Sequence, residues 1–258
     1  MKKAVLILWR IWFYTLAAVP VILLFIPLTL VLLLPNGYRY VFWIARNFWA
    51  PLVLYGMGFH VKKLGNFPPE DQPLMLVANH TSYIDVMVML RMRKAPFVFV
   101  GKKELVKIPL FGYIFKRAAI MVDRSNSKSR FGVYGRAQKV IDKGYSVCIF
   151  PEKEYVDETI LLNPFKQGAF KLGIEHKLPI FPIVFLDCKR KFPWYTSYGY
   201  PGTLRVRALE VLPTHHLKES DISSLQEEVY SRIQNELLND PDQLALKAID
   251  LWKSRFTG

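Results

Sequence analysis

Residues 74–85 read LMLVANHTSYID, and within these residues the sequence changes from a strand pattern to a helix start. The first five residues form a continuous apolar run with the length of a buried strand. The polar residues that follow are typical of a short loop and the first turn of a helix. Because open α/β sheets place their ligand sites at the carboxyl ends of strands, we expect His80 to lie at such a site.

The sequence after this stretch keeps the same alternation of short apolar runs and amphipathic segments, as an α/β sheet with flanking helices requires. Further strands are expected at residues 97–100, 119–122, 146–150, 180–186 and 204–210. Helices are expected at residues 82–92, 129–143 and 165–176, followed by an amphipathic C-terminal pair at 222–238 and 242–255.

The residues before this domain are apolar and free of acidic groups. Between Arg10 and Arg39 no residue is charged, and a helix over residues 11–34 could cross a hydrocarbon layer of about 30 Å. Prolines at 20 and 27 are expected to kink that helix. The second apolar stretch, residues 38–61, is rich in tryptophan and tyrosine, which favours a helix in the membrane interface.

The charge distribution indicates how this region is oriented. The net charge is +14, yet residues 1–69 hold seven basic residues and the first acidic residue is Glu70. Lysines flank both outer ends of the apolar region, which predicts that both ends lie on the cytoplasmic side. We therefore expect a membrane-associated helical hairpin over 1–63 and a cytosolic domain over 64–258. A cleaved signal peptide is the weaker alternative, because its apolar core has only about 7–15 residues.

The sequence lacks the motifs of several other classes of binding site and active site. Glycine-rich nucleotide motifs, the serine nucleophile elbow and zinc-type cysteine and histidine spacings are absent. A basic surface could bind nucleic acid, but the basic residues are not interleaved with aromatic residues and no helix-turn-helix pattern is present. Nucleic acid is therefore not expected as a partner. The two cysteines, Cys148 and Cys188, lie in apolar runs, so we interpret them as reduced core thiols.

The spacing of His80 and Asp85 has two interpretations. Asp85 can lie in the first helical turn and return to the imidazole, which gives the base and orienting carboxylate that activate a hydroxyl group. Ser82 and Asp85 also fit an N-terminal capping box, in which the carboxylate only satisfies the helix's first donors. The spacing alone does not separate these two roles.

The order of several motifs resembles the glycerolipid acyltransferases, the family of 1-acylglycerol-3-phosphate acyltransferases. Asn79, His80 and Asp85 match its first signature. Residues 102–105 with Pro109, Gly112 and residues 120–124 match the second signature. Residues 150–152 match the start of the third signature, residues 165–168 match the basic motif after it, and residues 180–183 match the fourth. The resemblance implies a mixed sheet flanked by helices, as in glycerol-3-phosphate acyltransferases, with an N-terminal two-helix membrane-embedded motif. It also implies a location at the cytoplasmic face of the inner (plasma) membrane.

The resemblance also implies roles for single residues. His80 would be the general base and Asp85 its orienting carboxylate, while substrate-binding residues would be Asn79, Lys102, Arg124, Glu152, Lys166 and Gly168. We expect Gly168 to permit close packing or a close backbone approach rather than to take part in chemistry. The acyl donor would be acyl-CoA or acyl carrier protein, and the acceptor would be a lysolipid such as lysophosphatidic acid. Membrane lipids would be further partners of the protein. No metal and no cofactor is implied.

The third signature departs from the family pattern. After Glu152 the family continues with glycine, a small hydroxyl residue and often arginine, whereas this chain has Lys153, Glu154 and Tyr155. Arg124, Lys153 or Lys166 could supply the missing charge, because a phosphate needs cationic donors but not one fixed position. The alternatives are an acceptor with another head group, such as a lyso-aminolipid, or a non-catalytic membrane-anchored binding module.

Overall fold

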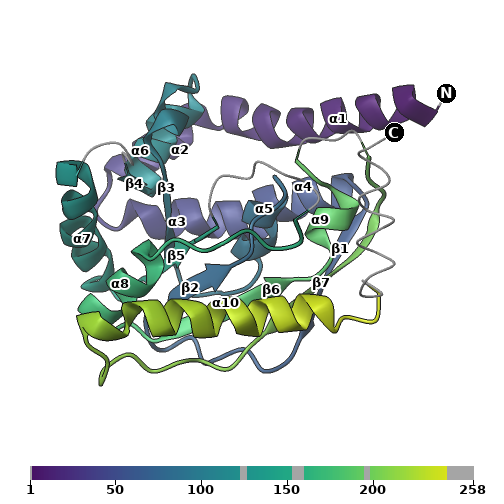
Figure 1. Cartoon of the computed structure of the whole chain (residues 1–258). Coiled ribbons are helices and arrows are strands. Elements are labelled where there is room, and N and C mark those ends of the chain that lie inside the picture. Colours follow the sequence, from purple (N-terminus) through teal and green to yellow (C-terminus); the bar gives the residue numbers. More distant parts are fainter. Residues whose placement is uncertain (1, 123–126, 153–159, 195–197, 243–258) are drawn as a thin grey trace. The chain divides into compact units, whose positions relative to one another are not determined.

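The computed structural model describes residues 2–122, 127–152, 160–194 and 198–242 (Figure 1). By its internal contacts the chain divides into two compact units. The first unit comprises residues 1–60, 69–74 and 86–149, and the second comprises residues 61–68, 75–85 and 150–258. The described residues contain a seven-stranded mixed sheet with flanking helices, which confirms the expected fold class.

The first unit opens with a series of apolar helices. These are α1 (Lys2–Leu23), α2 (Phe25–Leu33), α3 (Gly37–Ile44), a π-helix (Ala45–Trp49) and α4 (Ala50–Gly56). The break between α1 and α2 falls at Leu24, between the two prolines that were expected to kink a single helix. Asn36 adopts a left-handed conformation, with φ 59°, at the turn into α3.

Many large apolar side chains of this helical region face outward. Among them, those more than half exposed include Leu8, Leu23, Ile26, Leu30, Leu33, Leu34, Trp43 and Tyr55. Of the described helices, the one over Lys3–Leu23 is long and apolar enough to cross a membrane by length and composition alone.

The remaining elements of the first unit include three parallel strands. Strand β3 (Phe97–Lys102) pairs on one side with β5 (Ser146–Ile149) and on the other with β4 (Ile120–Val122). The unit also contains a 3-10 helix (Lys103–Lys107), α6 (Phe111–Ala118), α7 (Ser127–Ile141) and all of α5 (Asp85–Leu90) except its first residue. Helix α7 contacts β4 and β5.

The other four strands follow in the order β1 (Phe59–Leu64), β7 (Gly202–Ala208), β6 (Ile180–Phe185) and β2 (Met75–Ala78), and they belong to the second unit except for the first two residues of β1. Strands β2 and β6 are parallel, and β7 is antiparallel to β6. The helices are α8 (Gly168–Glu175), α9 (Cys188–Lys191), a 3-10 turn (Glu219–Asp221) and α10 (Ile222–Leu238), which packs along β6 (Figure 1).

Apolar periodicity explains how α10 attaches to this sheet. Its buried residues are Ile222, Leu225, Val229, Ile233 and Leu237, spaced three or four apart as on one face of a helix. Every residue of β2 and β6 is buried. A strand covered on both faces is expected to be apolar throughout, as these two are.

The sequence predicted most of these elements but not all. Six expected strands and the helices around 82–92, 129–143 and 165–176 are present with shifted ends, and α10 has the expected bounds of 222–238. Strand β1 and helices α6 and α9 were not expected, and β1 occupies the end of the stretch interpreted as an interfacial helix. The expected helix at 242–255 lies outside the described residues except for Asp242. Cys148 and Cys188 are buried free thiols, as expected.

Candidate functional site

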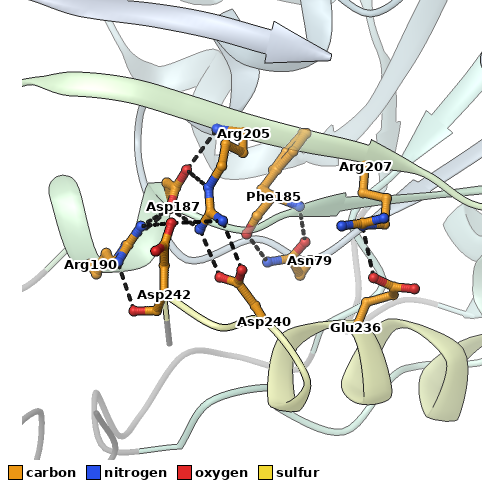
Figure 2. A network of polar contacts seen from close by, with 9 residues as sticks. All are labelled: Asn79, Phe185, Asp187, Arg190, Arg205, Arg207, Glu236, Asp240 and Asp242. Carbon is orange, nitrogen blue, oxygen red and sulfur yellow. Dashed lines mark hydrogen bonds and ion pairs between the residues drawn. The ribbon is translucent and has the colours of Figure 1, made fainter. Parts of the chain in front are cut away.

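The loop after β2 is held to the end of β6 by Asn79. The side-chain amide of Asn79 donates to the backbone oxygen of Phe185 at 3.1 Å, and its oxygen accepts from the Phe185 N–H at 2.8 Å (Figure 2). Asn79 is buried. It therefore fixes the start of the loop, and its expected contact with substrate stays a prediction.

His80 and Asp85 form a hydrogen-bonded pair in this loop. Nδ1 of His80 lies 2.9 Å from Oδ2 of Asp85, and the same oxygen accepts the N–H groups of Thr81 and Ser82 at 2.7 and 2.8 Å. Oδ2 of Asp85 thus holds the loop before α5, as in a capping box, and also contacts the imidazole, so the geometry is compatible with both interpretations of the spacing. A proton on Nδ1 leaves the lone pair of a neutral ring on Nε2.

Aromatic side chains from other segments pack against the imidazole. The ring of Phe150 stacks on His80 with a centroid distance of 4.1 Å and an angle of 17°. Trp194 meets the same ring edge-on at 4.5 Å. The His80 side chain remains 24% exposed, whereas Asp85 is fully buried. The ring is thus held in one plane while solvent or a substrate can still reach it.

Glu152 supports the backbone of His80. One carboxylate oxygen accepts the N–H of His80, and the other accepts the backbone N–H and the side-chain amide of Asn163 at 3.0 and 3.1 Å. Burial raises the pKa of the Glu152 carboxyl, and the hydrogen bonds from His80 and Asn163 act in the opposite direction. Both carboxylate oxygens of Glu152 therefore already accept hydrogen bonds within the protein. The sequence indicated only a contact with acceptor hydroxyls and did not indicate these internal bonds.

The other expected site residues are spread over the chain. The backbone N–H of Lys166 donates to the oxygen of Pro151 at 2.8 Å, and its side chain is exposed. Lys102 ends β3 in the first unit. Arg124 and the residues of the altered third signature, Lys153, Glu154 and Tyr155, lie outside the described residues.

Gly168 is the first residue of α8, and the expectation of close packing there is wrong for the described part of the chain. A Cβ atom added at Gly168 would meet no heavy atom within 4 Å. Among the described residues, no group of three or more histidine, cysteine, aspartate or glutamate side chains could hold a metal ion.

Sequence reasoning missed several partners of the pair. Asn163 and Trp194 carried no motif, and Phe150 was quoted only as part of a motif. Ser82 donates its hydroxyl to the backbone oxygen of Phe192, which joins the His80 loop to the segment after α9. The arrangement suits removal of a proton from a hydroxyl group by Nε2 of His80, with Asp85 stabilising the resulting imidazolium.

Comparisons with known proteins identify the family that this chain resembles. A family model described as acyltransferase matches residues 58–186. The chain is 29% identical to human 1-acyl-sn-glycerol-3-phosphate acyltransferase beta over 205 residues, which cover 76% of this chain and 70% of that protein. It is 32% identical to the alpha form of Ovis aries over 183 residues, or 68% of this chain and 61% of that protein.

A solved structure shares the fold. The crystal structure of the 1-acyl-sn-glycerophosphate (LPA) acyltransferase PlsC from Thermotoga maritima superposes with a TM-score of 0.74 at 21% identity. The superposition covers 92% of this chain and 98% of that chain. The sheet and helices described above therefore follow an architecture already seen in a solved protein.

Proposed function

The chain belongs to the acyltransferase family, and from that premise we propose that it transfers a fatty acyl group from a thioester donor to the free hydroxyl of a lysolipid. The proposed acceptor is 1-acyl-sn-glycerol-3-phosphate, which would give phosphatidic acid. The donor would be acyl-CoA or acyl carrier protein. The observation that carries the proposal is the His80 and Asp85 pair, 2.9 Å apart, in the loop after β2.

The reaction needs one base and no covalent intermediate on the enzyme. Nε2 of His80 takes the proton of the acceptor hydroxyl while the hydroxyl oxygen attacks the thioester carbonyl carbon. The carbon–sulfur bond then breaks, and the leaving thiolate takes up the proton from the imidazolium. Because a thiol has a pKa of about 8.5, its thiolate leaves readily and needs little assistance from an acid.

The cationic residues of the family motifs are proposed to bind the charged groups of the substrates. Lys102, Arg124 and Lys166 would contact the phosphate or stabilise the oxyanion of the transition state. Asn79 and Glu152 would support this chemistry by holding the loop that carries His80. Asn79 is hydrogen-bonded to the backbone of Phe185. Glu152 accepts the backbone N–H groups of His80 and Asn163. Gly168 would leave room for substrate at the start of α8.

We also propose where the protein works. Residues 1–63 would form the membrane-associated helical hairpin, with residues 64–258 as the catalytic domain at the cytoplasmic face of the inner membrane. The exposed apolar side chains of α1 to α4 support this assignment, because many large apolar side chains exposed in one region are typical of contact with lipid. The lysine pairs at both ends of the region support the cytoplasmic orientation.

A second acceptor class remains in competition. Lys153, Glu154 and Tyr155 replace the glycine, hydroxyl residue and arginine of the family pattern, which favours an acceptor with another head group, such as a lyso-aminolipid. A non-catalytic binding module would be favoured if His80 and Asp85 lay out of hydrogen-bond reach with no adjoining cleft. The two side chains are 2.9 Å apart, within hydrogen-bond reach.

The deciding experiment is a turnover panel. Purified protein in lipid vesicles is given acyl-CoA or acyl carrier protein as donor, with lysophosphatidic acid or a lyso-aminolipid as acceptor. We expect the fastest release of free thiol with lysophosphatidic acid, and none above background with His80→Ala. Faster turnover of the lyso-aminolipid would favour the second acceptor class. Equal turnover by wild type and His80→Ala would overturn the proposed chemistry.

A further inference from the structure

A short segment of the first unit carries exposed apolar side chains. It follows the 3-10 helix Lys103–Lys107 and continues into α6. Ile108, Leu110 and Tyr113 in this segment are 46%, 39% and 40% exposed. Single exposed apolar residues are common on protein surfaces, whereas three of them within six positions indicate a surface that contacts a partner.

The backbone of this segment is strained at Leu110. Leu110 has φ 61° and ψ −56°, and the N–H of Phe111 donates to the backbone oxygen of Pro109 at 2.6 Å. These angles and this bond define a γ-turn with a positive central φ, a rare and strained turn that glycine adopts more easily than leucine. The Leu110 side chain nevertheless stays 39% exposed, so its burial within the described structure does not fully offset the strain. Strained residues of this kind are common where a protein binds a partner.

Basic side chains accompany these apolar ones. Residues 103–118 contain four basic residues and one acidic residue. Lys107, Lys116 and Arg117 are exposed, and within the described part of the chain none of the three forms an ion pair. The guanidinium of Arg117 lies 3.6 Å from the centroid of the Tyr113 ring. Cations beside exposed aromatic and aliphatic side chains are typical of protein surfaces that lie in the headgroup layer of a membrane.

Helix α6 packs against α2 within the same unit (Figure 1). Ile114 of α6 is buried in one cluster with Leu28 of α2. The ring of Tyr113 meets the ring of Phe25 edge-on, with the centroids 5.8 Å apart. On α2 itself, Leu30 is 59% exposed. The segment therefore lies beside the helix whose exposed leucines support the proposed contact with lipid.

We propose that this surface docks the catalytic domain on the headgroup layer of an anionic lipid membrane. The docking patch consists of Lys107, Ile108, Leu110, Tyr113, Lys116 and Arg117. Its three cations contact lipid phosphates, and its three apolar side chains enter the boundary between headgroups and acyl chains. This contact adds to the one proposed for residues 1–63. An acidic protein such as acyl carrier protein would also suit the charge, but the position of the patch beside the exposed leucines of α2 favours the membrane.

A fluorophore at position 110 tests the contact directly. Leu110→Cys in the full chain is labelled with nitrobenzoxadiazole, whose emission moves to shorter wavelength in an apolar environment, while the buried Cys148 and Cys188 are protected from the label. We expect this shift on vesicles of phosphatidylcholine and phosphatidylglycerol. The matched control is Leu238→Cys, because Leu238 at the end of α10 is 38% exposed, and its label should not shift. Unshifted emission at position 110 on vesicles that bind the protein would overturn the proposal.

Vesicle flotation of charge variants tests the cations of the patch. We expect Lys107→Gln/Lys116→Gln to lower the affinity for anionic vesicles about tenfold, because each basic residue near an anionic surface strengthens binding several-fold. Binding to vesicles of phosphatidylcholine alone should not change. The control Lys139→Gln/Lys143→Gln removes the same charge from exposed positions of α7 and its end, and should bind both kinds of vesicle as the wild type does.

Each flotation is repeated in the Leu30→Asp/Leu33→Asp background, in which the contact of the hairpin is expected to be weak, so that binding by the hairpin does not hide the patch. An equal loss of binding in the patch variant and its control would overturn the proposal. Unchanged flotation together with weaker binding of acyl carrier protein would overturn it in favour of that protein. Neither assay involves acyl transfer, so a wild type without turnover that still shows the shift at position 110 would refute the proposed function and leave the docking patch supported.

Discussion

Nδ1 of His80 lies 2.9 Å from Oδ2 of Asp85, and that oxygen also accepts the backbone N–H groups of Thr81 and Ser82 in the loop before α5. One carboxylate therefore organises both the helix start and the tautomer of the imidazole. With a proton on Nδ1, a histidine held in this way presents the lone pair of Nε2 to a neighbouring hydroxyl group. Substitution of His80 is therefore expected to lower turnover and leave the fold in place, whereas substitution of Asp85 can lower both turnover and stability.

Replacement of His80 by alanine should remove the base and leave the fold in place, because the loop is held by backbone and carboxylate contacts. We expect kcat to fall by roughly 10²-fold to 10⁴-fold, the usual contribution of a positioned general base. The rate of thiol release from acyl-CoA with lysophosphatidic acid measures the loss. His215→Ala, which removes an exposed histidine, is the matched control and should retain wild-type turnover.

Substitutions of Asp85 should separate its two roles. Asp85→Asn keeps an oxygen for the N–H groups of Thr81 and Ser82 but loses the charge, so turnover should fall with little loss of stability. Asp85→Ala also removes the cap and should lower the free energy of unfolding by about 1 to 2 kcal/mol. Urea unfolding and turnover of both variants give the comparison. Equal stability of the two variants would mean that the capping bonds contribute nothing.

Glu152→Gln tests whether Glu152 acts through the backbone of His80. The glutamine amide would place an NH₂ group against an N–H donor of His80 or Asn163, which costs about 1 to 3 kcal/mol of stability. Because His80 loses its support, we expect a lower kcat with a nearly unchanged KM for the acceptor. A raised KM with unchanged kcat would instead favour direct contact with an acceptor hydroxyl. Asn163→Ala, which removes only the side-chain bond, should have the smaller effect.

The His80 and Asp85 pair was predictable from the sequence because its interactions are local. The apolar run before His80 indicates a buried strand, and five residues of separation allow the carboxylate to reach the ring. Most strands were predictable for a similar reason, since continuous apolar runs are expected in strands buried on both faces. Strand β1 was missed because Phe59–Leu64 carries two lysines directly after an apolar helical stretch.

The partners that complete the site depend on strand neighbours and not on local spacing. Strands β2 and β6 run parallel with Ala78 opposite Ile183, so the segments that follow both strands leave the same edge of the sheet. That register brings Phe185 to Asn79 and Phe192 to Ser82, more than 100 residues apart in sequence. No local pattern indicates which strand lies next to β2, so these contacts required the structure.

The exposed apolar side chains of α2 predict a measurable membrane contact. Leu30 and Leu33 are 59% and 64% exposed, so aspartate at both positions should leave the fold intact. Each charge placed in the hydrocarbon costs about 2.5 to 3.5 kcal/mol, and binding to anionic lipid vesicles should fall at least about tenfold. Vesicle flotation measures the bound fraction. Leu238→Asp, at an exposed leucine of α10, is the control, and an equal loss in that variant would contradict the assignment.

Asp187 predicts a specific pH dependence of stability. Burial tends to raise the pKa of this carboxyl, but hydrogen bonds from Arg205 and the charge of Arg190 outweigh burial and lower the pKa. A carboxyl with a lowered pKa in the folded protein stabilises it above the unfolded pKa of about 3.9, and that stability is lost as the pH falls through the folded value. Asp187→Asn should therefore be less stable than wild type at pH 7.

The expected difference at neutral pH is about 3 kcal/mol, because the substitution leaves two arginines without their buried partner. As the pH falls below the unfolded value of about 3.9 toward the lowered folded pKa, the wild-type carboxylate also becomes protonated, so the difference should shrink. Urea unfolding of both proteins between neutral and acidic pH measures it. Asp142→Asn removes the same charge from an exposed position and should show no such convergence. A difference between wild type and Asp187→Asn that stays constant with pH would show that packing, and not the charge of Asp187, stabilises this network.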